Sequence, residues 1–214
     1  MKKMTMVVLA FALCFGLTSR AFALSHSKQE SLEVSYMGGS YNDILDLNGQ
    51  VVSQDKVPVR GMDVNWDFHR RFLWLSYGLA LRERSMNAPQ GKLNFTGVGG
   101  RIGFVTNTFE DPHRWPIGFH GYLSAVIGSM TKIEPKTYDQ GIVSSFSDAD
   151  TGVDVMLHGW KSADGTKYRS ALVASFDTSY EAMLTPLLTK GATPEKGFLS
   201  FSGSTPKFSL SLYW

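Results

Sequence analysis

Apolar and polar residues alternate with a period of two along eight segments of the chain. In the cleanest segment, Leu75, Tyr77 and Leu79 share one face, while Ser76 and Gly78 lie on the other. This period is that of a β-strand with two different faces. The alternation predicts eight strands, at residues 32–36, 61–68, 73–82, 93–105, 117–127, 153–158, 168–177 and 208–214. Phe95 falls on the wrong face of its segment, which predicts a β-bulge near Gly99 and Gly100.

The connections between these segments alternate in length. Short turns are expected at 69–70, 107–113 and 162–165, the last with the Asp-Gly signal of a hairpin. Longer connections are expected at 42–56, 85–92, 131–149 and 179–205. Short turns at one rim and long loops at the other are typical of barrels in the bacterial outer membrane. The pattern therefore predicts an all-β fold, an eight-stranded antiparallel up-and-down transmembrane β-barrel.

The tryptophans support the same architecture. All five lie near the short-turn end of their segments, which predicts an aromatic girdle at the periplasmic interface. The expected girdle consists of Trp66, Trp74, Trp115, Trp160 and Trp214.

The polar face carries charges of both signs among glycines and serines. Because eight strands leave an interior just wide enough to be filled by side chains, we expect these charges to pair inside a plugged polar lumen. The expected network is Glu33, Asp63, Asp67, Arg82, Arg101, Asp154, Arg169 and Asp177. The opposite face lacks charges over about 9–11 residues in most strands, the length needed to cross a membrane.

The N-terminus has the features of a secretory signal. Lys2 and Lys3 precede an apolar stretch, and residues 21–23, Ala-Phe-Ala, offer a cleavage site. We therefore expect a cleaved signal peptide at 1–23 and one barrel domain at 24–214. Cys14, the single cysteine, leaves a lipoprotein as the alternative. The formal net charge of +2 argues against nucleic acid as a partner.

The last segment, Phe-Ser-Leu-Ser-Leu-Tyr-Trp, alternates up to a terminal aromatic residue. It resembles the C-terminal signal that outer-membrane barrels present to the barrel-assembly machinery. The overall pattern resembles the small barrels of the OmpX, Ail and lipid A deacylase type, which implies a location in the bacterial outer membrane. The deacylase family has a His-x-Ser-Asn run, whereas residues 174–179 here, Ala-Ser-Phe-Asp-Thr-Ser, contain no histidine.

Few residues suggest chemistry. His120 and His158 are expected to face the lumen, where a hydrolase could pair one of them with Asp154 or Ser124. A hydrogen-bonded interior histidine is the simpler interpretation. No catalytic set, metal-ligand spacing or cofactor motif stands out.

Three functions therefore remain. The first is a non-enzymatic surface barrel that acts in adhesion or envelope integrity through long extracellular loops. The second is an enzyme that modifies lipid A, and the third is a narrow channel for small solutes. The expected partners are outer-membrane lipid and lipopolysaccharide, the assembly machinery during insertion, and a host or surface ligand at the loops. The apolar residues of those loops could instead pack over the barrel mouth.

Overall fold

The computed structural model describes residues 28–47, 50–70, 75–89, 91–106, 116–134, 138–139, 144–189 and 196–214. The expected signal peptide, and the boundary after residue 23, lie outside these residues. Nine strands are present: β1 (Lys28–Leu47), β2 (Gln50–Arg70), β3 (Leu75–Ala88), β4 (Gly91–Val105), β5 (Ile117–Glu134), β6 (Tyr138–Asp139), β7 (Ser144–Lys161), β8 (Tyr168–Thr189) and β9 (Lys196–Tyr213). None of the described residues forms a helix long and apolar enough to cross a membrane.

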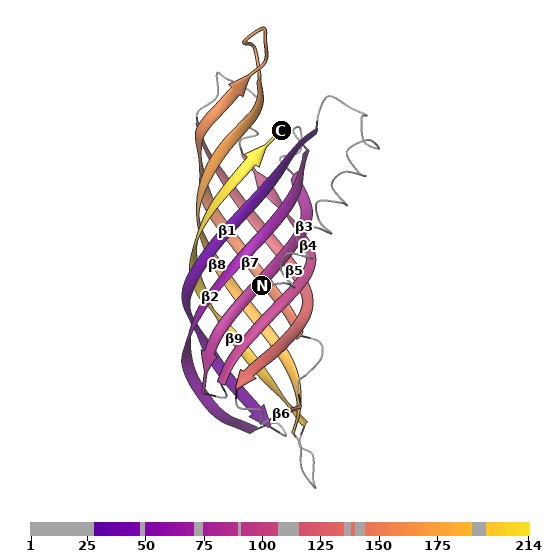
Figure 1. The fold of residues 1–214 in the computed structure, drawn as a ribbon, viewed down its shortest axis with the longest axis vertical. Helices are drawn as coiled ribbons and strands as arrows, with labels where there is room; N and C mark the ends of the chain where they lie inside the picture. Colours follow the sequence, from indigo (N-terminus) through magenta and orange to yellow (C-terminus); the bar gives the residue numbers. More distant parts are fainter. Residues whose placement is uncertain are drawn as a thin grey trace.

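Eight of these strands form a closed antiparallel ring, which confirms the predicted fold (Figure 1). Neighbours in sequence pair with one another, and β9 pairs with both β8 and β1 to close the ring. The closing seam runs to the end of the chain, because Trp214 and Glu30 exchange both backbone hydrogen bonds, at 2.9 and 3.0 Å. The two-residue strand β6 lies outside the ring, paired with the end of β8.

The strands are staggered around the ring. Following paired residues once around leads from Val34 through Val64, Leu81, Val98, Ile127, Ser145, Leu184 and Ser200 to Ile44 in the same strand. This stagger of ten residues over eight strands tilts each strand by roughly 40°. From one strand to the next in the order β1, β2, β3, the paired residue therefore lies a little over one residue farther from the end that holds Trp214.

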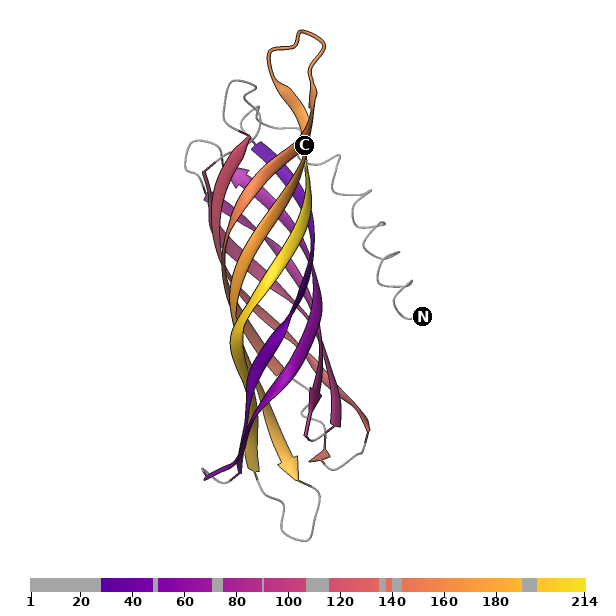
Figure 2. The same ribbon diagram turned by 90° about the vertical axis from the view of Figure 1, so that its left-hand side faces the viewer.

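We call the end with Lys28, Trp214 and the β7–β8 turn the terminal end, which is at the top of Figure 2, and the opposite end the distal end. The words above, higher and upper mean nearer the distal end throughout. The prediction of long loops at the distal end is wrong. Asn42 pairs with Lys56, and Ser179 pairs with Thr205, so strands run through both expected loops. Only two residues separate β1 from β2, two separate β3 from β4, nine separate β5 from β7, and six separate β8 from β9.

The outer surface of the terminal half is apolar. In the terminal half of β9 and just after it, the outward residues are Pro206, Phe208, Leu210, Leu212 and Trp214. The last four of these are each more than 40% exposed. Nine tilted residues rise by roughly 22 Å, close to the apolar band of about 25 Å on membrane barrels. Charged outward residues begin above this band, with Arg60 on β2 and Glu83 on β3.

Above the band the apolar face turns inward. Phe95, Phe146, Tyr41 and Phe201 are fully buried in the barrel interior at this level, within a core that also includes Met37, Val57, Val59, Met86, Leu93, Val126, Met130, Met183 and Leu199. The expected bulge near Gly99 and Gly100 is therefore wrong. Pairing of β4 with β5 is regular from Leu93 to Val105, and Phe95 faces inward because the apolar face changes sides.

The β7–β8 hairpin extends beyond the ring at the terminal end (Figures 1 and 2). Pairing with β5 stops at Val155 and pairing with β9 stops at Ala171, so the rest of the hairpin pairs only with itself. Its turn has Gly165 at φ +71°. The Asp164 carboxylate accepts hydrogen bonds from the Ser162 hydroxyl and, at 3.1 Å, from the Thr166 backbone N–H. These bonds lower the pKa of Asp164 to about 2.

Shortening Phe95 to alanine tests the inward apolar core. We expect Phe95→Ala to lower the free energy of unfolding by about 3–5 kcal/mol, because it leaves a cavity in a packed interior. Thr96→Ala, at the exposed neighbouring position, should change it by less than about 0.5 kcal/mol. Urea titration in detergent micelles measures the free energy of unfolding of both variants. Equal losses would contradict the placement of Phe95 in an inward apolar core.

The hairpin turn gives a pH prediction. Because the folded pKa of Asp164 lies below the usual value, the turn should be stabilised above about pH 4 and should lose this contribution as the pH falls through about 2. In a carboxyl NMR titration, Ser162→Ala should raise the pKa of Asp164 toward 3.8. An unchanged pKa would show that the Ser162 contact does not matter.

Candidate functional site

The interior of the terminal half is polar, directly behind the apolar outer band. Inward-facing positions on all eight ring strands supply its side chains, because each strand points every second residue into the lumen. The charged members are buried, with relative exposures of 8% or less. They form two clusters, one around Lys207 and one around Arg101.

Lys207 on β9 is the centre of the first cluster. Its Nζ lies 2.9 Å from Asp150 Oδ1, 3.1 Å from Asp63 Oδ2, 3.3 Å from Asp148 Oδ2 and 3.5 Å from Glu181 Oε1. These four carboxylates come from β2, β7 and β8. One ammonium group thus joins the C-terminal strand to three others across the lumen.

Two arginines on β3 complete the first cluster. Arg84 pairs with both Asp63 and Glu181, with 2.7 Å between its Nη2 and Glu181 Oε1, and Tyr41 also donates a hydrogen bond to Glu181. Arg82 Nη2 lies 3.0 Å from Asp148 Oδ2. Both guanidinium groups are almost completely buried. The ion pairs with these carboxylates must therefore offset the free energy lost when the charged groups leave water.

The Arg101 cluster lies nearer the terminal end. Arg101 Nη1 lies 3.2 Å from Glu33 Oε1, and its Nε lies 3.0 Å from Asp67 Oδ1. Glu33 also accepts a hydrogen bond from Asn65 Nδ2 at 2.7 Å. The guanidinium carbon lies 3.6 Å from the centroid of the Tyr122 ring, a close cation–π contact.

His120 bridges two carboxylates in this cluster. Its Nδ1 lies 2.8 Å from Asp154 Oδ1 and its Nε2 lies 3.1 Å from Asp177 Oδ1. Ser175 donates to Asp154 and Ser209 donates to Asp177, at 2.6 and 3.0 Å. A general base needs one ring nitrogen free to accept the proton that it removes from a substrate. Because both nitrogens of His120 contact carboxylates, this geometry favours a structural role for the histidine.

The other candidate histidine is elsewhere. His158 was expected in the lumen but is exposed on the β7–β8 hairpin, with its ring 4.7 Å from that of Trp160. The reason is a register shift between Met156 and His158, which reverses the alternation there.

Asp63, Asp148 and Glu181 form a group of buried carboxylates that could hold a metal ion by proximity, with one oxygen from each within 4.8 Å of the others. The Lys207 ammonium lies within 3.5 Å of all three. It supplies the positive charge that a metal would bring, so the residues of this group do not fit a resident metal.

The structure places seven of the eight expected network residues in the interior: Glu33, Asp63, Asp67, Arg82, Arg101, Asp154 and Asp177. These seven residues do not form one network. Asp63 and Arg82 belong to the Lys207 cluster, and the other five belong to the Arg101 cluster. Arg169 is exposed and outside the network. It has the alternation of an inward residue, but it lies on the part of β8 that extends beyond the ring.

Several interior charges were not in the expected set: Asp43 nearer the distal end, and Arg84, Asp148, Asp150, Glu181 and Lys207 in the first cluster. Their signal was present in the alternation. Arg84 is two residues from Arg82, Glu181 is four from Asp177, and Lys207 is two from Ser209. They were missed because β1, β3 and β8 were expected to end too early, and β7 and β9 were expected to begin too late.

The described tryptophans lie at different heights. Trp214 is at the terminal edge of the apolar band, and Trp160 is on the hairpin beyond it. Trp66 faces outward on β2, with its ring 5.0 Å from that of Phe68. Trp74 and Trp115, the other expected girdle residues, lie outside the described residues.

Comparison with known proteins identifies the fold and no family. No protein-family model matches the chain. A solved structure of similar fold is the outer membrane protein OprG from Pseudomonas aeruginosa, with a TM-score of 0.52 and 8% identity, covering 87% of this chain and 94% of OprG. The toluene transporter TodX from Pseudomonas putida gives a TM-score of only 0.19 at 6% identity, covering 89% of each chain.

Two curated sequences match part of the chain. CWF19-like protein 2 from Homo sapiens is 27% identical over 115 residues, and its Mus musculus counterpart is 27% identical over 116 residues. Each match covers 54% of this chain and 12% of the curated protein, so it spans only about an eighth of those proteins. These matches assign no family to the chain.

Replacing Lys207 tests the first cluster. Lys207→Met should lower the free energy of unfolding by about 3–5 kcal/mol, because four buried carboxylates then share only two arginines. Adding Asp150→Asn should restore part of this loss, since Asp150 makes the shortest contact with Lys207. Urea titration of the two variants measures the difference, and no recovery in the double variant would contradict the pairing.

Proposed function

We propose that the chain is a bacterial outer-membrane barrel with a closed lumen, acting without catalysis at the cell surface in adhesion or envelope integrity. The observation that carries this proposal is the double filling of the interior. Paired charges fill the part behind the apolar band, and a packed apolar core fills the part above it. A side-chain-filled interior of this width leaves no path for solutes.

The apolar outer band supports placement in a membrane. Its height of roughly 22 Å suits the outer membrane, and closure of the ring satisfies the backbone hydrogen bonds that lipid cannot. The same placement puts the distal half outside the hydrocarbon. The surface role is therefore assigned to a rigid barrel extension rather than to the long loops expected from the sequence.

The partners proposed for this function follow from the placement. The apolar band contacts outer-membrane lipid, and the rim above it, with Arg60 and Glu83, lies at the level of lipopolysaccharide. The C-terminal strand would engage the barrel-assembly machinery during insertion. A host or surface ligand would meet the distal hairpins.

Planar-bilayer recording tests the closed lumen. The purified full chain should show no steady channel openings, because both zones of the interior are filled. Large, steady openings would overturn the proposal in favour of a solute channel. Mass spectrometry of lipid A, with and without expression, should show no change in acylation; a changed pattern would assign a lipid-modifying enzyme instead.

Cysteine labelling tests the orientation. Asn87→Cys, exposed near the distal end, should react with a membrane-impermeant maleimide in intact cells. Ala163→Cys, in the β7–β8 turn, should react only after the outer membrane is permeabilised. The parent chain, whose single cysteine is Cys14, gives the background. The opposite labelling pattern would contradict the proposed placement.

A further inference from the structure

One wall of the barrel differs from the rest of its outer surface. On β7, the outward residues Ser145, Ser147, Ala149 and Thr151 are all small. Larger side chains stand on the strands to either side, and they are strongly exposed: Leu123 (63%) and Ile127 (66%) on β5, and Phe176 (59%) and Tyr180 (55%) on β8. We call this small-floored groove between two ridges the β7 trough.

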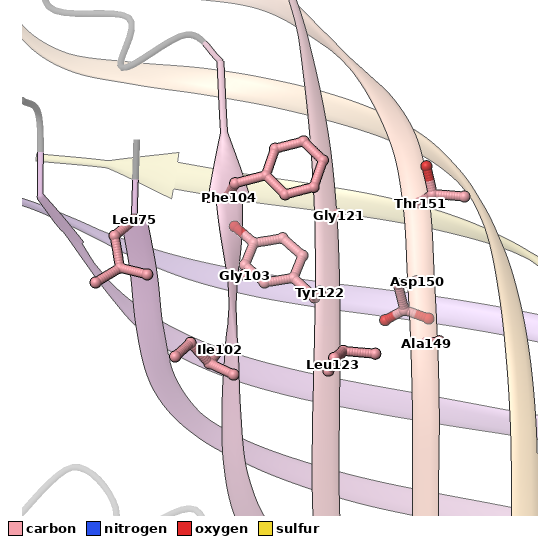
Figure 3. A pocket seen from close by; sticks show the side chains of 10 residues that line it. All are labelled: Leu75, Ile102, Gly103, Phe104, Gly121, Tyr122, Leu123, Ala149, Asp150 and Thr151. Atoms are coloured by element: carbon pink, nitrogen blue, oxygen red, sulfur yellow. The ribbon is translucent and has the colours of Figure 1, made fainter. Parts of the chain in front are cut away.

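Two hollows adjoin the trough, one lying mainly over β4 and β5 and meeting β7 at its edge, and one crossing β7 from β5 to β9. The lower one, about 490 Å³, reaches from Leu75 and Ile102 past Leu123 to Ala149 and Thr151 (Figure 3). The upper one, about 460 Å³, is lined by Ile127, Ser145, Ser147, Ala182 and Leu184, among others. Ser147 and Ala149 are successive outward residues on β7, so the two hollows adjoin.

The wall around the trough carries no charge. Among the described outward residues of the ring portions of β5, β7, β8 and β9, those with assigned exposure include no acidic or basic side chain. On the opposite wall Lys56, Arg60, Glu83 and Lys92 are exposed. Depletion of charge is the compositional mark of an interface core.

The upper hollow lies beyond the apolar band. Thr131 is three strands along the ladder from Arg60 and therefore about four residues higher, which puts Ile127 level with Arg60. Ser145 and Leu184 follow Ile127 around the ladder and lie higher still. Acyl chains can cover the lower hollow but do not reach this level, so a protein surface fits the whole trough better.

We propose that the β7 trough binds a second copy of this chain, with Leu123 and Ile127 of each copy seated in the trough of the other. A ridge directly beside a groove of similar length is self-complementary under a twofold axis along the membrane normal. The small residues of the floor allow close approach of the two walls, as they do between packed segments in membranes.

The area suits a weak, reversible assembly. The trough and its two ridges span three strands about 4.8 Å apart over about eight residues, which gives roughly 380 Å² in each copy. Together the two faces bury roughly 760 Å², the size of a transient protein interface. The inference rests on the membrane placement proposed above, but the labelling of Asn87→Cys and Ala163→Cys does not depend on self-association. A failure of the proposed membrane placement can therefore be distinguished from a failure of the proposed dimer.

Filling the trough tests the proposal. Dimerisation of the full chain in lipid bilayers, measured by fluorescence energy transfer over a range of dilution, should weaken at least tenfold in Ser147→Trp. Thr96→Trp, exposed on the charged wall, is the matched control and should leave the dimer unchanged. Heat-modifiable gel mobility shows that each variant is folded.

Crosslinking gives a second measurement. Copies carrying Ile127→Cys should form disulfides with copies carrying Ser147→Cys in the outer-membrane fraction, whereas Glu83→Cys should not. A wild-type chain that stays monomeric at all dilutions would overturn the proposal and leave acyl chains as the occupant. A crosslink confined to a different protein would overturn it as well.

Discussion

The narrow interior of an eight-stranded ring is the constraint on which the rest of this molecule depends. At this strand number the lumen has room for side chains and for little else. Whatever faces inward must therefore find its partners among the other inward residues. Behind the apolar band these are charges, and an unpaired charge there would cost several kcal/mol. The Lys207 and Arg101 clusters are the result, with each cation contacting carboxylates from two or more strands.

The same strands meet the opposite requirement above the band. There the exterior becomes polar and the interior becomes an apolar core around Phe95 and Phe146, whose rings stack at 5.6 Å. The lower half thus has the inside-out pattern of a membrane barrel, and the upper half has the pattern of a soluble β-barrel. One continuous hydrogen-bonded ladder joins the two, so the upper half is held rigidly by the half that carries the apolar band.

Much of this fold could be predicted from the alternation alone. The period of two, repeated eight times with a terminal aromatic strand, was sufficient for the strand number, the order and the seam between β1 and β9. The extensions could not be predicted, because a strand was expected to keep the same apolar face along its whole length. Where the apolar face changes sides, as at Phe95, the pattern resembles a break. Val57 and Val59 therefore fell between the expected loop at 42–56 and the expected strand at 61–68. The pairs within the lumen also depend on the stagger of ten residues, which no single segment reveals.

The position of Lys207 has a consequence for how the chain reaches its final state. Asp63, Asp148, Asp150 and Glu181 are carried by strands that precede β9, and their lysine is carried by β9, which closes the ring. An open sheet in lipid would hold these carboxylates with too few cations and with two unpaired edges. Joining β9 to β1 and β8 removes both penalties in a single event. Closure of the ring is therefore the step that removes both penalties, and an open sheet would be unstable in apolar surroundings.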